Sequence, residues 1–234
     1  FEVDYRPLLE TDAGKEEDGT LSFRCEELGA YNYKLVTRAN PPTALSTLHF
    51  EAPLGATQVE TFTFRVFNTK QTTFSMTVDQ PLFFEVAQKI AVDPTSSWDG
   101  HDVRVEVTFE PESLGEVQDT LVISSQDSGE YRCALRGVCT PALPQGPFVL
   151  QPGGSKDISF RNVFNEAREF SFTVDHPRFS VSSGSVSIPS KSNKPVTVKF
   201  TAEAGSGAVS AKLFVSCTSL PDMPPWVYYL QGES

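Results

Sequence analysis

The chain has 234 residues, of which 39% are hydrophobic and 18 are phenylalanine, enough apolar material for two ordinary domains. Charged residues make up 21%, close to the globular norm, and no run of 18 apolar residues is present. The formal charge of −11 repels nucleic-acid phosphates and anionic lipid head groups. Disorder is therefore excluded, and we expect neither nucleic-acid binding nor membrane insertion.

Residues 1–42 have the pattern of the end of a β-domain whose beginning lies upstream. Phe1–Pro7 parallels Val105–Pro111, and Gly29–Tyr31 has its counterpart 100 residues further along the chain. Between these segments, Thr11–Gly19 is acidic and polar. We expect it to be an exposed, mobile loop.

Short segments of alternating apolar and polar residues follow over 43–140, and turn residues separate them, as at Asp93-Pro94 and Asp99-Gly100. This pattern, with no helical period, predicts an antiparallel β-sandwich. The expected strands are Val59–Phe67, Thr73–Asp79, Phe83–Ala87, Val103–Phe109, Asp119–Ser124 and Glu130–Val138.

One of these strands occurs twice. Phe74–Pro81 returns 96 residues later as Phe170–Pro177, and both copies end at an Asp-x-Pro. A period near one hundred residues fits a small β-sandwich and is far longer than a solenoid repeat. Residues 148–234 are therefore a second, more divergent copy. Three prolines within 141–147 predict a short, stiff linker between the copies.

The last strand of each copy carries three apolar or aromatic residues two positions apart, which places them on one face. We expect this face to point inward. The three triplets are Tyr31, Tyr33 and Leu35; Tyr131, Cys133 and Leu135; and Trp226, Tyr228 and Leu230.

The sequence shows no catalytic, cofactor-binding or metal-binding constellation. The cysteines form no Cys-x-x-Cys pair, and the three histidines are scattered through turns and linkers. Gly153-Gly154-Ser155-Lys156 lacks the spacing of a phosphate-binding loop and leads into a strand. We expect four free thiols, as in a reducing compartment.

Trp98 is a candidate protein-interaction residue. It lies in a polar loop whose counterpart, Ser190–Lys194, has no aromatic residue, and exposed tryptophans often anchor interfaces. Alternatively, its ring folds back over the end of the core. We name His101 with Trp98 as the other candidate contact.

The ordered motifs resemble those of ASH domains, immunoglobulin-like relatives of the major sperm protein fold that are strung in tandem in hydin and other cilia- and flagella-associated proteins. The motifs are a Phe-x-Val-x-Asn-like strand, Pro-x-Phe-x-Val, Val-x-Val-x-Phe-x-Pro, a glycine-centred turn, Leu-x-Ile and a closing Leu-x-Gly. The resemblance covers 43–140 well, 1–42 as a half copy and 148–234 more loosely, since Thr201-Ala202-Glu203 replaces a Glu-Pro.

The resemblance implies an all-β chain of tandem immunoglobulin-like sandwiches. Its parts are then the C-terminal half of an upstream domain (1–42), a complete ASH-type domain (43–140), a proline-rich linker (141–147) and a divergent ASH-type domain (148–234).

It also implies a non-enzymatic scaffold in the cytoplasm, within a ciliary or flagellar axoneme, whose partners are axonemal or cytoskeletal proteins. Two alternatives stay open. One is a trafficking adaptor of the major-sperm-protein type that binds short peptide motifs, for which a basic groove is required. The other is an extracellular or periplasmic adhesion module, for which disulfides are expected.

Overall fold

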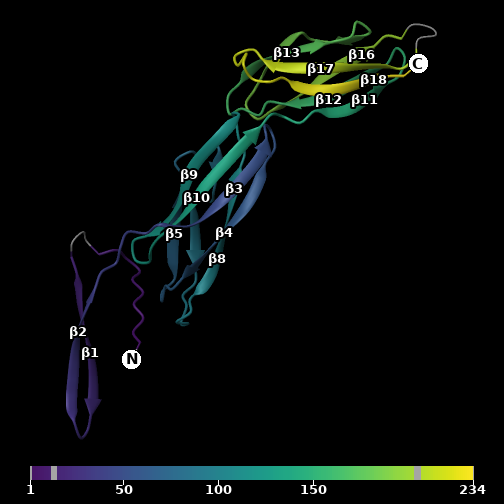
Figure 1. The fold of residues 1–234 in the computed structure, drawn as a ribbon. Helices are drawn as coiled ribbons and strands as arrows, with labels where there is room; N and C mark the ends of the chain where they lie inside the picture. Colours follow the sequence, from purple (N-terminus) through teal and green to yellow (C-terminus); the bar gives the residue numbers. More distant parts are fainter. Residues whose placement is uncertain (1, 12–14, 203–206, 234) are drawn as a thin grey trace.

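The computed structural model describes residues 2–11, 15–202 and 207–233, and every regular element in this part of the chain is a β-strand. A hairpin and two β-sandwiches follow one another in an elongated arrangement (Figure 1). The predicted all-β sandwich fold is confirmed.

The first sandwich consists of a five-stranded sheet, ordered β3-β10-β9-β5-β7, and a three-stranded sheet, ordered β4-β8-β6. Its strands are β3 (Ala44–Pro53), β4 (Gln58–Val66), β5 (Thr72–Thr77), β6 (Phe84–Glu85), β7 (Lys89–Val92), β8 (His101–Phe109), β9 (Gly115–Ser125) and β10 (Gly129–Thr140).

The second sandwich repeats this topology, with sheets ordered β11-β18-β17-β13-β15 and β12-β16-β14. Its strands are β11 (Gln145–Leu150), β12 (Ser155–Arg161), β13 (Arg168–Val174), β14 (Phe179–Val181), β15 (Ser185–Ile188), β16 (Asn193–Phe200), β17 (Val209–Cys217) and β18 (Trp226–Gly232). In both sandwiches the first strand pairs in parallel with the last, and the other pairings are antiparallel.

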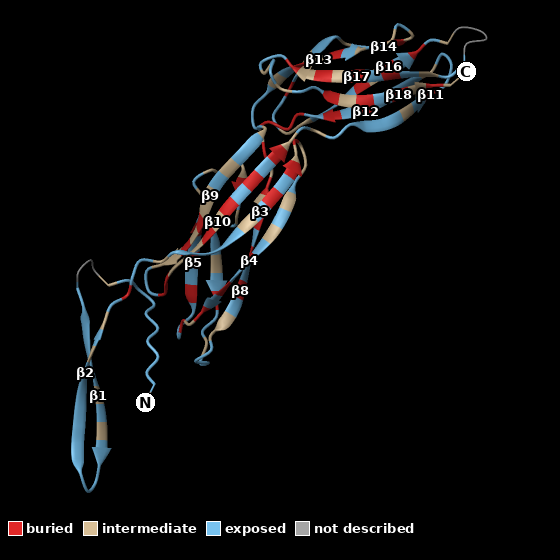
Figure 2. Ribbon diagram, viewed as in Figure 1, coloured by how far each residue is buried: buried red, intermediate tan, exposed pale blue. Residues whose placement is uncertain are grey.

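Alternation along the strands produces the two cores. On β4, Phe62, Phe64 and Val66 are buried while the residues between them are exposed (Figure 2). The repeated strand contributes Phe74 to the first core and Phe170 to the second, each with no exposed surface. The closing triplets of both sandwiches also point inward, whereas Tyr31 and Tyr33 are exposed.

Two strands of the first sandwich were not predicted. β3 alternates Leu48, Phe50 and Ala52 toward the core. This signal was present in the sequence, but the strand begins only two residues after Pro42. β7 is only four residues long. The strand expected over Phe83–Ala87 is reduced to β6, because Phe83 and Phe84 donate backbone hydrogen bonds back to the Gln80 carbonyl in a turn.

The connection between the sandwiches is shorter than the expected linker. β10 ends at Thr140 and β11 begins at Gln145, so Pro147 lies within a strand and follows a cis peptide bond from Gly146. Only residues 141–144 lie outside strands here.

The N-terminal part differs most from expectation. β1 (Glu17–Cys25) and β2 (Gly29–Thr37) pair as an antiparallel hairpin whose surface is largely exposed (Figure 2). β1 thus includes the end of the expected acidic loop, while residues 12–14 of that loop lie outside the described residues. The segment Phe1–Pro7 was expected to resemble the strand that ends at Phe109, but its described residues, 2–7, form no strand. β8 is held between β4 and β6, whereas no described strand pairs with residues 2–7.

We predict that Phe74→Ala destabilises the first sandwich selectively. Truncating a buried phenylalanine costs ~3–5 kcal/mol, against a typical domain stability of ~5–15 kcal/mol. Because Phe74 and Phe170 lie in separate core clusters, calorimetry should show one transition lowered and the other little changed. Phe170→Ala is the matched control and should lower the other transition. Equal loss in both transitions from either variant would contradict separate cores.

Candidate interaction surfaces

Trp98 lies in the loop between β7 and β8 and is 62% exposed, so its ring does not cover the end of the core. The guanidinium of Arg6 lies 4.8 Å from the centre of this ring and 4.8 Å from that of Phe67. Arg6 Nη1 also donates a hydrogen bond to the Trp98 carbonyl. His101 begins β8, where its register partner is Val66. As contacts for a separate partner protein, Trp98 and His101 remain predictions.

Local hydrogen bonds hold the Trp98 loop in shape. The Ser97 amide donates to Thr95 Oγ1 at 3.1 Å, and the Asp99 amide donates to Ser97 Oγ at 3.1 Å. Gly100 closes the loop at φ +69°, and a Cβ there would lie 2.4 Å from the Val66 carbonyl oxygen. Glycine is required at this position by both conformation and space. The loop therefore presents Trp98 outward on an ordered backbone.

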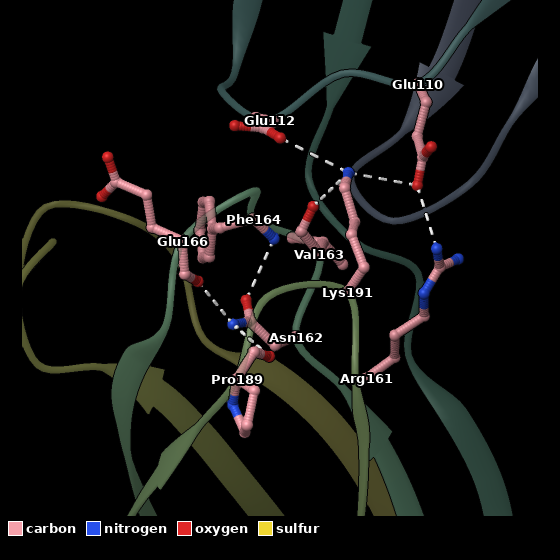
Figure 3. Close-up of polar contacts among 9 residues, drawn as sticks. All are labelled: Glu110, Glu112, Arg161, Asn162, Val163, Phe164, Glu166, Pro189 and Lys191. Atoms are coloured by element: carbon pink, nitrogen blue, oxygen red, sulfur yellow. Dashed lines mark hydrogen bonds and ion pairs between the residues drawn. The ribbon is translucent and has the colours of Figure 1, made fainter. Parts of the chain in front are cut away.

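A second polar cluster joins the two sandwiches end to end (Figure 3). The ammonium of Lys191, in the loop between β15 and β16, lies 3.3 Å from Glu110 Oε1 and 3.4 Å from Glu112 Oε1. It also donates a hydrogen bond to the Val163 carbonyl at 2.7 Å. Arg161 Nη2 donates to Glu110 Oε1 at 3.2 Å. We call these five residues the joint cluster.

Asn162, whose side chain is buried, organises the loops that carry the joint cluster (Figure 3). Its amide nitrogen contacts the carbonyls of Glu166, Ile188 and Pro189 at 2.8, 3.0 and 3.0 Å. Its oxygen accepts a hydrogen bond from the Phe164 amide at 3.0 Å. Asn162 thus ties the loop after β12 to the segment after β15, as a buried polar group with satisfied hydrogen bonds can do.

Lys191 is the only non-glycine residue at positive φ, 51°, in the described part of the chain. Its amide donates to the Phe164 carbonyl at 3.1 Å. A left-handed conformation costs roughly 1–3 kcal/mol for a residue with a Cβ and persists only where its surroundings enforce it. Here it places the ammonium between two carboxylates and a carbonyl. Sequence reasoning missed this cluster, although Glu110 belongs to the Glu-Pro that ends β8.

Apolar contacts accompany the joint cluster. Leu54 and Cys139 belong by sequence to the first sandwich but lie in the buried cluster of the second, and Leu114 packs against the same cluster. Gly55 approaches so closely that a Cβ would lie 2.8 Å from Val163 Cγ1. Apolar contacts from these few residues of the first sandwich therefore add to the polar contacts of the joint cluster.

Burial also affects the thiol at this junction. It raises the pKa of Cys139 to about 11 and that of Tyr228, in the second core, to about 12. A thiol with this pKa is ionised only to about one part in a thousand at pH 8, and the thiolate is the reactive form. Cys25 on β1 is exposed, and all four cysteines are unpaired.

Over residues 2–11, 15–202 and 207–233, no group of His, Cys, Asp and Glu side chains is placed to hold a metal ion. Nor does any helix in this part of the chain have the length and apolar character needed to cross a membrane.

We predict that Lys191→Gly loosens the joint between the sandwiches. The substitution removes the ammonium, so that Glu112 loses its ion pair with Lys191 and Glu110 keeps only Arg161, and glycine suits the left-handed backbone. Small-angle scattering of the parent should fit one elongated conformation, whereas the variant should require an ensemble of domain angles. Ser190→Gly, at an exposed neighbouring position, is the control and should behave as the parent. A variant curve identical to the parent's would show that the cluster does not fix the angle.

We further predict that Cys139 reports opening of this joint. In the native parent at pH 8, alkylation should modify Cys25 rapidly and the three buried cysteines slowly. Lys191→Gly should accelerate modification of Cys139, because separating the sandwiches both hydrates the thiol and lowers its pKa toward the ordinary value. Peptide mass spectrometry identifies the site. Equal acceleration at Cys133 and Cys217, which lie in the two cores, would indicate general unfolding instead.

Comparison with known proteins shows clear relatives. The chain is 35% identical over 243 positions to human "Hydrocephalus-inducing protein homolog" and 35% identical over 237 positions to mouse "Hydrocephalus-inducing protein". Each match covers 99% of this chain but only 4% of the relative, so the chain spans a small fraction of the length of these curated proteins. No family model matches.

Similarities to solved structures are more distant. The ASH / PapD-like domain 7 of human CEP192 is 12% identical, with a TM-score of 0.34, over 42% of this chain and 82% of that one. An endo-fucoidan hydrolase of glycoside hydrolase family 107 is 8% identical, with a TM-score of 0.41, over 94% of this chain and 34% of that one.

The match to these sequence relatives extends over both sandwiches and over the N-terminal hairpin. This chain is therefore a relative of hydrocephalus-inducing protein and carries tandem ASH-type, immunoglobulin-like repeats of the hydin type.

Proposed function

We propose that this chain is a non-enzymatic scaffold of a ciliary or flagellar axoneme, acting on the cytoplasmic side through contacts with axonemal or cytoskeletal proteins. The observation that carries the proposal is the relationship to hydrocephalus-inducing protein over 99% of the chain. The ASH-type motifs supply the link to cilia.

The domain assignment that accompanies this proposal is a complete ASH-type domain over 43–140, a linker over 141–147 and a divergent ASH-type domain over 148–234. The last three residues of this linker lie in β11. Two separate buried clusters of aromatic and aliphatic residues support it. The joint cluster favours a defined angle between the two domains, which is what a spacer in an ordered assembly requires.

We assign residues 1–42 to the C-terminal half of a further immunoglobulin-like domain. The β1–β2 hairpin has the turn of β9–β10, with Gly29 at φ +86° and Gly129 at φ +80°. The Thr11 amide donates to the Ala39 carbonyl at 3.3 Å, and their counterparts Gly115 and Cys139 are register partners. A backbone contact between these counterparts therefore closes both hairpins, within the ladder of β9 and β10 and beyond the end of the ladder of β1 and β2.

The exposed face of the hairpin supports this assignment. Leu121, Ile123 and Leu135 are fully buried in the first sandwich, whereas their counterparts at 21, 23 and 35 are partly exposed. β9 and β10 are each flanked on the other side, by β5 and β3 respectively. Strands in these two positions, with a second sheet above them, would bury the hairpin face as in the complete domains.

The two alternatives are less well supported. A trafficking adaptor that captures acidic peptide motifs needs a basic surface, and the formal charge is −11. An adhesion module is expected to contain disulfides, and the four cysteines are free, three of them buried.

Cosedimentation with demembranated axonemes tests the proposal. We expect saturable binding to axonemes and none to bare microtubules, because the acidic chain should not dock by charge alone on an acidic filament. The chain carrying both Phe74→Ala and Phe170→Ala is the unfolded control and should not bind. Absence of binding, or equal pelleting with bare microtubules, would overturn the proposal.

A further inference from the structure

Residues 6–11 occupy the same place in the N-terminal part as residues 110–115 occupy in the first sandwich. Arg6 precedes Pro7 as Glu110 precedes Pro111. Five residues after each of them, Thr11 and Gly115 contact the equivalent residues Ala39 and Cys139. Arg6 is therefore the positional counterpart of Glu110, the residue that bridges to the second sandwich.

The loops that receive these two residues are also counterparts. Arg65 is the register partner of Asp102, and Arg161 is the register partner of Asn193. Gly100 lies two residues before Asp102, and Lys191 lies two residues before Asn193. Both have positive φ, 69° for Gly100 and 51° for Lys191. The Trp98 loop and the Lys191 loop are thus the same loop of successive copies, and Phe67 and Val163 both lie just after the equivalent strands β4 and β12.

We propose that the surface formed by Phe67 and Trp98 is a docking surface for a preceding immunoglobulin-like domain. The part of that domain that docks is the end nearest the next domain in the chain, and it presents an arginine at the position equivalent to Glu110. The inference rests on the assignment of residues 1–42 made above. In this chain the occupant is the end that contains Arg6. The same loops meet as between the two sandwiches, but a cation held by two aromatic rings replaces the ion pairs.

The contacts suit this chemistry. A guanidinium is flat and weakly hydrated, so it stacks on aromatic rings better than an ammonium does. The rings of Phe67 and Trp98 both lie 4.8 Å from the Arg6 carbon, and the Trp98 carbonyl accepts one of its hydrogen bonds. A second point of contact is Gly129, at φ +80°, where a Cβ would lie 1.8 Å from the Leu8 carbonyl oxygen. Only glycine permits that approach.

The Phe67–Trp98 surface and the loop that carries Lys191 therefore favour preceding domains whose ends carry opposite charges. The loop that carries Lys191 attracts the carboxylates of Glu110 and Glu112. In the Trp98 loop, Gly100 stands in place of Lys191, and Arg65, the counterpart of Arg161, is already paired with Asp102, so an acidic end would find no unpaired cation among these counterparts. Conversely, an arginine in place of Glu110 would be repelled by Lys191 and Arg161. Successive domains would be matched to their neighbours by these end loops.

Fluorescence quenching of Trp98 tests the docking directly. Trp226 is 5% exposed, so acrylamide reports mainly on Trp98. Arg6→Ala should raise the quenching constant by a factor of ~1.5–2, because one ring face becomes open. Arg6→Lys should give an intermediate value. Arg24→Ala removes the same charge from an exposed position on β1 and should change nothing.

A distance measurement tests the consequence for the domain end. Spin labels on Cys25, the exposed native cysteine, and on Leu82→Cys, an exposed position of the first sandwich, report how the hairpin sits. The parent pair should give one narrow distribution, and both Arg6→Ala and Trp98→Ala should broaden it, while Arg24→Ala should not. Circular dichroism confirms that each variant is folded.

Unchanged quenching and unchanged distances in the Arg6 and Trp98 variants would overturn the docking surface, as would a broad distribution in the parent. These outcomes are separable from the proposed function. If the chain binds axonemes but the spin-label distances are the same in the Arg6 and Trp98 variants as in the parent, only the docking inference is wrong. If the chain does not bind axonemes but the distance distribution broadens in the Arg6 and Trp98 variants, only the proposed axonemal role is wrong.

Discussion

The structure depends on one constraint: a β-sheet with an apolar face must bury that face against a second layer. Both sandwiches satisfy it, with Phe62 and Phe64 of one sheet packed among residues of the other, including Phe74. The hairpin of β1 and β2 has the same inward pattern but no described second layer, and its tyrosines are exposed. The same sequence pattern therefore gives a closed core in two copies and an open face in the third.

Closure of each core leaves its end loops as the means of coupling to a neighbour. The loops are ordered by buried polar groups, since Asn162 in the second sandwich and Asn68 in the first each bind carbonyls of two separate segments. Loops fixed in this way can hold a charged group at a set position. These two asparagines therefore connect the end loops of each sandwich to the strands that form its core.

The sequence predicted the repeat, the fold and most long strands, because apolar and polar residues alternate along a strand that has one buried and one exposed face. Sequence reasoning missed β7, which is too short to show a period, and β3, which begins close after two prolines. It also missed which asparagine of the second sandwich takes the role of Asn68. Val163-Phe164-Asn165 matches Val66-Phe67-Asn68 in sequence, yet Asn162 is the residue that acts as Asn68 does. The joint cluster could not be predicted either. It unites Glu110 with Lys191 across two domains, and no local pattern encodes their distance.

The core residues therefore determine the fold of each domain, whereas the end-loop residues determine how it contacts its neighbour. Phe74 and Phe170 are interchangeable in role, because apolar burial is non-directional and requires only volume and pattern. At the ends, by contrast, equivalent positions hold Arg6 and Glu110, or Gly100 and Lys191, whose interactions depend on charge and geometry. Copies that share a fold can thus differ in which neighbour they accept. In a chain of similar domains, the order and angle of neighbours must then be set at the joints, since the cores alone cannot distinguish one copy from another.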